Sequence, residues 1–215
     1  MIKISSVEKL IAACICFVLC MILARVLYSG SGVYLFLLWN IFLGWIPFRL
    51  SILIAKQKTF QWYSVLLLIS WLAFFPNALY IVTDLMHLGE KNNVPLWYDV
   101  ILLFASASTG LVMAFISLLK IESFLKNNMR IKMVNAIIFF SLLLGSFGVY
   151  LGRFLRWNSW DIICNPFQLI SEITKLLIFP KEYTGAWAAT FVFAAFFFAL
   201  YLLIKKLPST LKENA

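Results

Sequence analysis

The chain has 215 residues, of which 63% are hydrophobic and only 13% are charged, and its mean hydropathy is +0.95. Soluble domains carry about 25% charged and about 45–50% apolar residues, so this composition excludes a soluble globular protein and predicts a multi-pass membrane protein. The net charge is +9. Because the basic residues fall in short connections between apolar runs, we assign them to membrane topology and not to nucleic-acid binding.

Six apolar runs follow one another, each close to the length of roughly 20 residues that a helix needs to cross a bilayer. Long continuous runs predict α-helices, because backbone polar groups in lipid must be satisfied within the segment. The predicted fold is an all-α integral membrane protein with six transmembrane helices in a single domain, residues 1–215. The predicted spans cover residues 10–28, 33–55, 60–82, 96–119, 133–151 and 186–204.

Lys and Arg residues divide unevenly between the two sides of this arrangement. Because cytoplasmic loops are enriched in Lys and Arg, the distribution predicts that both termini are cytoplasmic. Of the 18 Lys and Arg residues, the opposite side holds only Arg25, Lys91, Arg153, Arg156, Lys175 and Lys181.

The long connection between the fifth and sixth spans contains a predicted amphipathic helix, residues 165–179. Asn165 is the expected N-cap, Pro166 takes the first helical position and Gln168 the reciprocal capping position. Apolar residues then recur at helical spacing, but the segment is too short to cross a bilayer. We expect it to lie in the outer membrane interface.

The end of the third span carries a first polar constellation. Asn77, Tyr80, Asp84 and His87 follow one another at i, i+3, i+7 and i+10, which places them on one stripe of an α-helix. Pro76 precedes them and removes one backbone donor, and Asn77 can donate to a freed carbonyl. Asp84 can orient the His87 ring, raise its basicity or share a metal with it.

Two arginines carry a second constellation just after the fifth span. Arg153 and Arg156 are three residues apart and can face one site, although they lie on the side that is poor in positive charge. The planar guanidinium suits a carboxylate or a phosphate.

Aromatic and polar residues follow these arginines in the same connection. Trp157 and Trp160 suit the headgroup level of a membrane. We count Asn158 among the candidate ligand-binding residues, and Asp161 can pair with an arginine or act in catalysis.

Several roles for these residues remain open. Asp84 can form a structural ion pair with Arg153 or Arg156, and the arginines can instead bind an anionic lipid headgroup or a phosphate. A catalytic site would use Asp84, His87 and Asp161, and a metal site has only one His and two acids to draw on. No phosphate-binding loop, dinucleotide fingerprint or common hydrolase motif is present, so no cofactor is assigned.

Two further features concern packing between helices. Asn40 lies deep in the second span, where an amide most often hydrogen-bonds across helices. Gly148 and Gly152 form a G-x-x-x-G in the fifth span. We expect this motif to pack against another helix of the same chain in preference to forming a homodimer.

Four segments together resemble a known family: LWNIFLGWIP, FFPNALYIVTDLMHL, PLWYD and GVYLGRFLRWNSWD, at residues 38–47, 74–88, 95–99 and 148–161. They are similar to the bacterial multi-pass membrane proteins grouped as domain-of-unknown-function family 1361. The resemblance implies a bacterial cytoplasmic membrane protein with several helices, and it brings no catalytic residues or cofactor with it.

The functional hypothesis is a site on the outer face that binds an anionic lipid, an envelope precursor or a partner. We expect the polar residues to form one cluster at the outer ends of the second, third and fifth helices, covered by the helix at residues 165–179. The alternative is a membrane-embedded hydrolase or transferase in which His87 is general base or metal ligand and Asp84 orients it. A small transporter is the third hypothesis, but it needs a polar path that the fourth and sixth spans barely offer.

Overall fold

The computed structural model describes residues 6–89, 94–158 and 161–213, and all regular secondary structure in these ranges is helical. Six of the helices are long and apolar enough to cross a membrane, which confirms the predicted fold. The chain is therefore a multi-pass integral membrane protein. In chain order the elements are α1 (Ser6–Ser29), α2 (Phe36–Ala55), α3 (Trp62–Tyr80), the 3₁₀-helix η1 (Ile81–His87), α4 (Leu96–Lys126), α5 (Ile131–Arg153), α6 (Asp161–Cys164), α7 (Pro166–Ile178) and α8 (Thr184–Glu213).

The helix ends differ from the apolar runs because hydropathy reports the bilayer and not the hydrogen-bonded helix. α4 continues to Lys126, seven residues beyond the predicted end of its span. Its last turns keep a buried acid, Glu122, which accepts a hydrogen bond from the Tyr201 hydroxyl of α8 at 2.7 Å. Lys205 and Lys126 also pair with this carboxylate.

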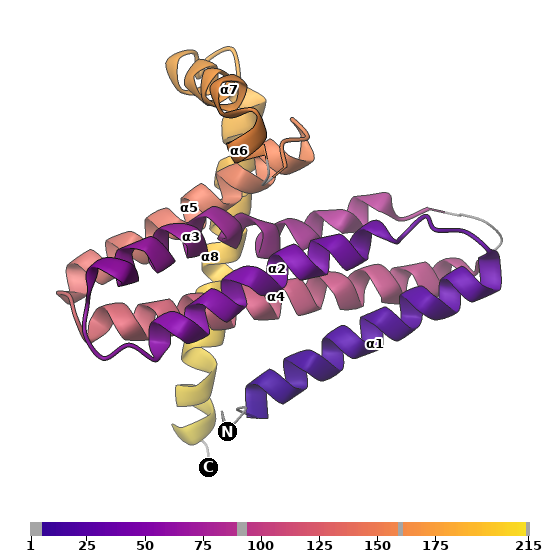
Figure 1. Cartoon of the computed structure of the whole chain (residues 1–215), viewed down its shortest axis with the longest axis horizontal. Coiled ribbons are helices and arrows are strands. Elements are labelled where there is room, and N and C mark those ends of the chain that lie inside the picture. Colours follow the sequence, from indigo (N-terminus) through magenta and orange to yellow (C-terminus); the bar gives the residue numbers. More distant parts are fainter. Residues whose placement is uncertain (1–5, 90–93, 159–160, 214–215) are drawn as a thin grey trace.

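The central helices are α2, α3, α4 and α5, with α1 packed on α4 and α8 packed on α5. Figure 1 shows α1 on one flank of the molecule, and α8, in yellow, running steeply across the direction of the other long helices. The largest buried cluster joins α2, α3, α4, α5 and α8. A polar chain crosses it, because Trp71 Nε1 donates to Ser117 Oγ at 2.6 Å and Ser117 Oγ donates to the Pro47 carbonyl at 3.2 Å.

The third span changes its helix type where the polar constellation begins. α3 continues through Pro76 to Tyr80 and then tightens into η1, which has about three residues per turn. The α-helical stripe predicted from Asn77 to His87 is therefore wrong beyond Tyr80. In η1 the side chains of Asp84 and His87 are three residues apart and lie above one another.

Small residues bring the neighbouring helices close to α3 and η1. Ile81 at the start of η1 packs against Gly44 of α2 and Gly110 of α4, where an added Cβ would lie 2.9 and 2.8 Å from its Cδ1. On α5, a Cβ at Gly148 would lie 2.7 Å from the ring of Pro76. The expected packing of the G-x-x-x-G motif within the chain is confirmed.

The connection between α5 and α8 contains α7, which begins as predicted with Asn165 at the N-cap and Pro166 in its first turn, but the cap lacks the expected side-chain hydrogen bonds. Asn165 makes no side-chain hydrogen bond to the helix, and its amide Nδ2 donates instead to Asp161 Oδ1 at 3.2 Å. The predicted reciprocal cap is therefore absent, and the Asn165 side chain is instead directed toward Asp161. At the other end, Trp187 Nε1 of α8 donates to the Leu176 carbonyl at 3.1 Å and fixes α7 to α8.

Candidate functional site

Arg153, the last residue of α5, is the centre of a polar network. Its Nε donates to Thr83 Oγ1 at 2.8 Å, and one of its terminal nitrogens donates to Asp84 Oδ1 at 2.8 Å. The other terminal nitrogen is 2.7 Å from His87 Nε2. The ion pair is almost fully buried, with 11% of the Arg153 side chain and 1% of the Asp84 side chain exposed to solvent. The ion pair that sequence analysis offered as one alternative is therefore present, with Arg153 as the partner.

The same network positions two side chains from neighbouring helices. Asn40 of α2 donates its Nδ2 to Asp84 Oδ2 at 2.8 Å, so the interhelical role expected for this amide is confirmed. The Arg153 guanidinium lies 4.9 Å from the centre of the Tyr80 ring, a cation–π contact. α2, α3, η1 and α5 are thus tied together at one end of the bundle.

Arg156 lies outside this network. α5 ends at Arg153, the Trp157 N–H returns to the Leu151 carbonyl at 3.1 Å, and Arg156 between them adopts a left-handed backbone with φ of 60°. The three-residue spacing is consequently not helical here, and the Arg156 side chain is exposed.

Asp161 serves its own connection and not the Arg153 network. Its Oδ2 accepts a hydrogen bond from the Asn158 backbone N–H at 2.7 Å, which lowers the pKa of Asp161. Trp160, the remaining predicted residue of this stretch, lies outside the described residues.

A second buried ion pair, which sequence analysis missed, joins α1 to α4. Arg25 Nε donates to Asp99 Oδ1 at 2.7 Å, and the two side chains are 1% and 0% exposed. Tyr34 connects the two ion pairs: its ring lies 4.5 Å from the Arg25 guanidinium, and its hydroxyl donates to the His87 carbonyl at 3.2 Å. The signal was available, because Arg25 and Asp99 each lie about one helical turn inside the same end of their spans.

A pocket of about 260 Å³ adjoins the Arg153 network. α2, α3 and α5 form its walls, and the connection after α5 together with α6 and α7 contributes the rest of its lining. Its polar lining side chains are Asn40, Asn77, Tyr80 and Asn158. Four of the predicted ligand-binding residues therefore lie in the pocket wall, namely Asn77, Tyr80, Trp157 and Asn158.

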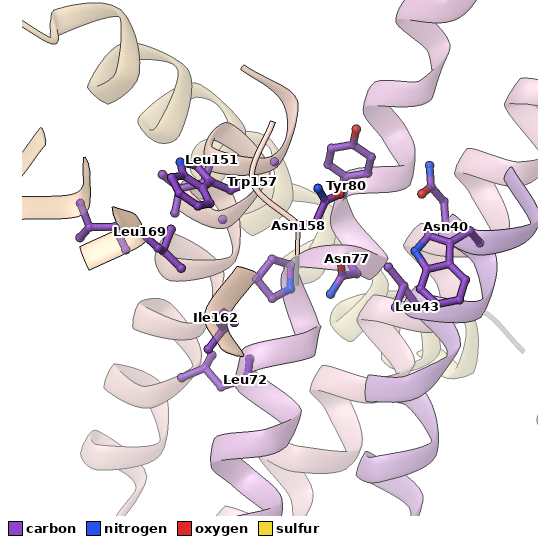
Figure 2. Close-up of a pocket in the computed structure, with 16 residues that line it drawn as sticks. Asn40, Leu43, Leu72, Asn77, Tyr80, Leu151, Trp157, Asn158, Ile162 and Leu169 are labelled. Carbon is purple, nitrogen blue, oxygen red and sulfur yellow. The ribbon is translucent and has the colours of Figure 1, made fainter. Parts of the chain in front are cut away.

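The pocket has two chemically different sides. Figure 2 shows Leu72, Ile162 and Leu169 on one side of it, and Asn40, Asn77, Tyr80 and Asn158 on the other, where Leu43 also lies. The apolar side belongs largely to α3, α6 and α7. The lining does not include Arg153, Asp84 or His87. Asp84 accepts a hydrogen bond from the lining residue Asn40, and Arg153 packs on the ring of the lining residue Tyr80.

The arrangement can bind a molecule that is polar at one end and apolar at the other. Within residues 6–89, 94–158 and 161–213, no three His, Cys, Asp or Glu side chains gather in the manner of a metal site. The site's described chemistry is therefore hydrogen bonding by amides and a phenol, supported by an ion pair.

Comparisons with known proteins agree with the resemblance seen in the sequence. No curated protein and no solved structure matches the chain. The family model for proteins of unknown function DUF1361 matches residues 39–204. This range includes most of α2, all of α3 to α7 and most of the span in α8, and with it every described residue of the pocket. The chain therefore belongs to the DUF1361 family of proteins of unknown function.

Proposed function

We propose that this protein binds an amphipathic lipid or lipid-linked molecule in the pocket between α2, α3, α5 and α7. The observation that carries the proposal is the division of one pocket into an apolar side and a polar side. Lipids combine these two chemistries in one molecule. The apolar side is continuous with α7, whose exposed Phe167, Ile170 and Leu177 suit a membrane interface.

The size of the pocket supports a headgroup site. Its 260 Å³ is somewhat below the roughly 300–1,000 Å³ of pockets that enclose a whole small molecule. A headgroup and the first part of an acyl chain fill such a volume, and the remaining chain extends into the bilayer. The ion-pair network contributes by fixing the wall, because Asp84 holds Asn40 and Arg153 holds Tyr80.

We also infer the membrane and the side on which the pocket lies. The distribution of Lys and Arg favours cytoplasmic termini, and the family resemblance favours a bacterial cytoplasmic membrane. With that orientation the pocket serves the outer leaflet, where lipids and lipid-linked envelope precursors occur.

The enzyme alternative receives less support than binding. It would use His87 as a general base, yet Arg153 is 2.7 Å from His87 Nε2 and neither residue lines the pocket. Asp161, the second predicted catalytic acid, accepts hydrogen bonds from its own connection. A binding role instead uses side chains that face the pocket.

The test is a substitution that fills the pocket without entering the helix packing. Ala73 lines the pocket and is exposed, so Ala73→Trp places a large ring in it. Ala12→Trp is the matched control, because Ala12 is exposed on α1 and is not a lining residue. The purified variants are incubated with a bacterial polar lipid extract, and the retained lipid is counted by native mass spectrometry.

We expect the wild type and Ala12→Trp to retain a defined lipid and Ala73→Trp to retain about tenfold less of it. Equal retention by all three proteins would contradict the proposal, because the bound lipid would then lie elsewhere on the apolar surface.

A further inference from the structure

We infer that the headgroup bound in this pocket is neutral and rich in hydroxyl groups, such as a sugar or another polyol, and not a phosphate. The inference rests on the proposed function, since it names the chemical class of the lipid for the same pocket. It follows from which polar groups line the wall, and from the partners that Arg153 already has.

The first argument is the type of polar group in the wall. Asn40, Asn77 and Asn158 present carboxamides and Tyr80 a phenol, and no charged side chain lines the pocket in the part of the chain that the structure describes. A carboxamide offers both a donor and an acceptor, as a hydroxyl does, so amides and hydroxyl groups match one another. A phosphate oxygen can only accept, and each amide oxygen in the wall would repel it.

The second argument concerns the Arg153 guanidinium, which contacts the lining residue Tyr80. Arg153 donates to Thr83 and to Asp84 and also contacts His87, at distances between 2.7 and 2.8 Å. Its charge is balanced by a carboxylate that is itself 1% exposed. A phosphate would have to take the guanidinium from Asp84 and leave that buried carboxylate uncompensated, which is costly.

The third argument is the position of the tryptophans. Trp39 and Trp157 both line the pocket, and Figure 2 shows Trp157 close to Leu151 on the apolar side. The carbon–hydrogen face of a sugar ring is apolar, whereas its rim carries hydroxyl groups. A ring of that kind can therefore lie against tryptophan with its hydroxyl groups toward the amides.

Two lipids with the same dioleoyl chains make the test: a glucosyl-diacylglycerol and a phosphatidylglycerol. Each is titrated against the purified full-length protein in detergent, and the apparent Kd is obtained by native mass spectrometry. We expect the glucosyl lipid to bind at least tenfold more tightly. Asn158→Ala should weaken its binding about three- to tenfold, as the loss of one neutral hydrogen bond does.

Asn158 suits this test because its short fold-related hydrogen bonds use its backbone, whereas its side-chain Nδ2 makes only a long hydrogen bond, 3.4 Å, to the Arg156 carbonyl. The N–H that donates to Asp161 and the carbonyl that accepts from the Asp161 N–H both remain in Asn158→Ala. The matched control is Asn127→Ala, at the C-terminal end of α4 and exposed, which should bind both lipids as the wild type does.

Introducing a positive charge into the pocket should reverse the lipid preference. Asn158→Lys places an ammonium group at the polar side of the pocket, so phosphatidylglycerol should gain at least fivefold in affinity while the glucosyl lipid loses affinity. A folded variant that gains binding excludes misfolding as the explanation.

The outcomes separate this inference from the function on which it rests. If both lipids bind equally and Ala73→Trp removes both, the pocket binds lipid but the headgroup assignment is wrong. Tighter binding of phosphatidylglycerol by the wild type overturns the assignment as well. If Ala73→Trp changes neither affinity, the proposed function fails together with the inference.

Discussion

Arg153 shows at the scale of a single residue why a buried arginine differs from a positive charge. Each of the three nitrogens of its guanidinium contacts a different residue of η1, namely Thr83, Asp84 and His87. Lysine has a point charge on a flexible stem and cannot reproduce this fork. The identity of the side chain should matter here even where its charge is conserved.

We therefore predict that Arg153→Lys lowers the stability of the purified protein by about 1–3 kcal/mol, the range for hydrogen bonds lost from buried polar groups. Thermal unfolding in detergent measures this as a lower Tm. Arg156→Lys is the control, since Arg156 is exposed and lies outside the network. An unchanged Tm for Arg153→Lys would mean that charge alone suffices at this position.

The Arg25–Asp99 pair permits a different prediction, because both side chains are almost fully buried. Asp99→Leu alone leaves a buried guanidinium without its carboxylate and should cost about 3–5 kcal/mol. Arg25→Met combined with Asp99→Leu removes both charges and should recover most of that loss. The check is a double-mutant cycle on Tm; additive effects of the two single substitutions would contradict the coupling.

These two ion pairs also show what a sequence can predict at residue scale. The Asp84–Arg153 pair was foreseen because both residues adjoin conspicuous polar stretches at predicted span ends. Arg25 and Asp99 stand alone in apolar surroundings, and the sequence gives their depth but not that α1 packs on α4. Thr83 was missed because its role depends on η1, in which it directs its hydroxyl oxygen toward Arg153.

At the scale of elements, the contact between α3 and α5 determines the shape of the pocket. Gly148 and Gly152 line it, and both contact α3. At Gly148 the obstacle to a side chain is the rigid ring of Pro76, whereas at Gly152 it is the Tyr80 ring, 3.2 Å from the added Cβ. The two helices cannot separate at Gly148 without opening this wall of the pocket.

Gly148→Ala should accordingly destabilise the protein by about 1–3 kcal/mol, the usual cost of overpacking. Gly185→Ala is a suitable control, because a Cβ there meets nothing within 4 Å. The Tm of each purified variant in detergent measures the change in stability. Lipid retention should fall for Gly148→Ala and stay unchanged for Gly185→Ala. A stabilised Gly148→Ala variant would show that Pro76 yields more readily than the geometry indicates.

Elements were predicted well where one principle dominates and poorly where two compete. Long apolar runs left no alternative to membrane helices. At residues 81–87, by contrast, α-helical periodicity placed Asp84 and His87 on the stripe of Asn77 and Tyr80, whereas the tighter η1 turns them away from that stripe together. At Asn165 the N-cap position was predicted correctly, but its side chain hydrogen-bonds to a carboxylate four residues earlier and not to the helix.

At the scale of the whole molecule, the pocket emerges from elements that are distant in the sequence. Its lining runs from Trp39 on α2 to Ile173 on α7. The sequence placed Asn77, Tyr80 and Asn158 in one polar cluster beneath the helix at residues 165–179, and all three line the pocket. It also put Arg156 and Asp161 in that cluster, because hydropathy does not give the directions of side chains beyond the end of α5. The helix at residues 165–179 was expected to cover the site, and α7 does line the pocket, but the apolar character of that side was not foreseen.

The orientation of the molecule gives the last prediction. Lys126 ends α4 and Cys164 ends α6, and the single membrane crossing of α5 lies between them. If the termini are cytoplasmic, a membrane-impermeant maleimide applied to intact cells should label the exposed Cys164. Cys14, Cys16 and Cys20 lie within the first span, where a charged reagent does not reach.

Cys164→Ser should abolish that labelling. Adding Lys126→Cys to it should restore labelling only after the membrane is permeabilised, because that end of α4 would face the cytoplasm. The reverse pattern would place the pocket on the cytoplasmic side and exclude an outer-leaflet ligand. Labelling of both positions in intact cells would contradict the crossing by α5, and with it the six-span topology.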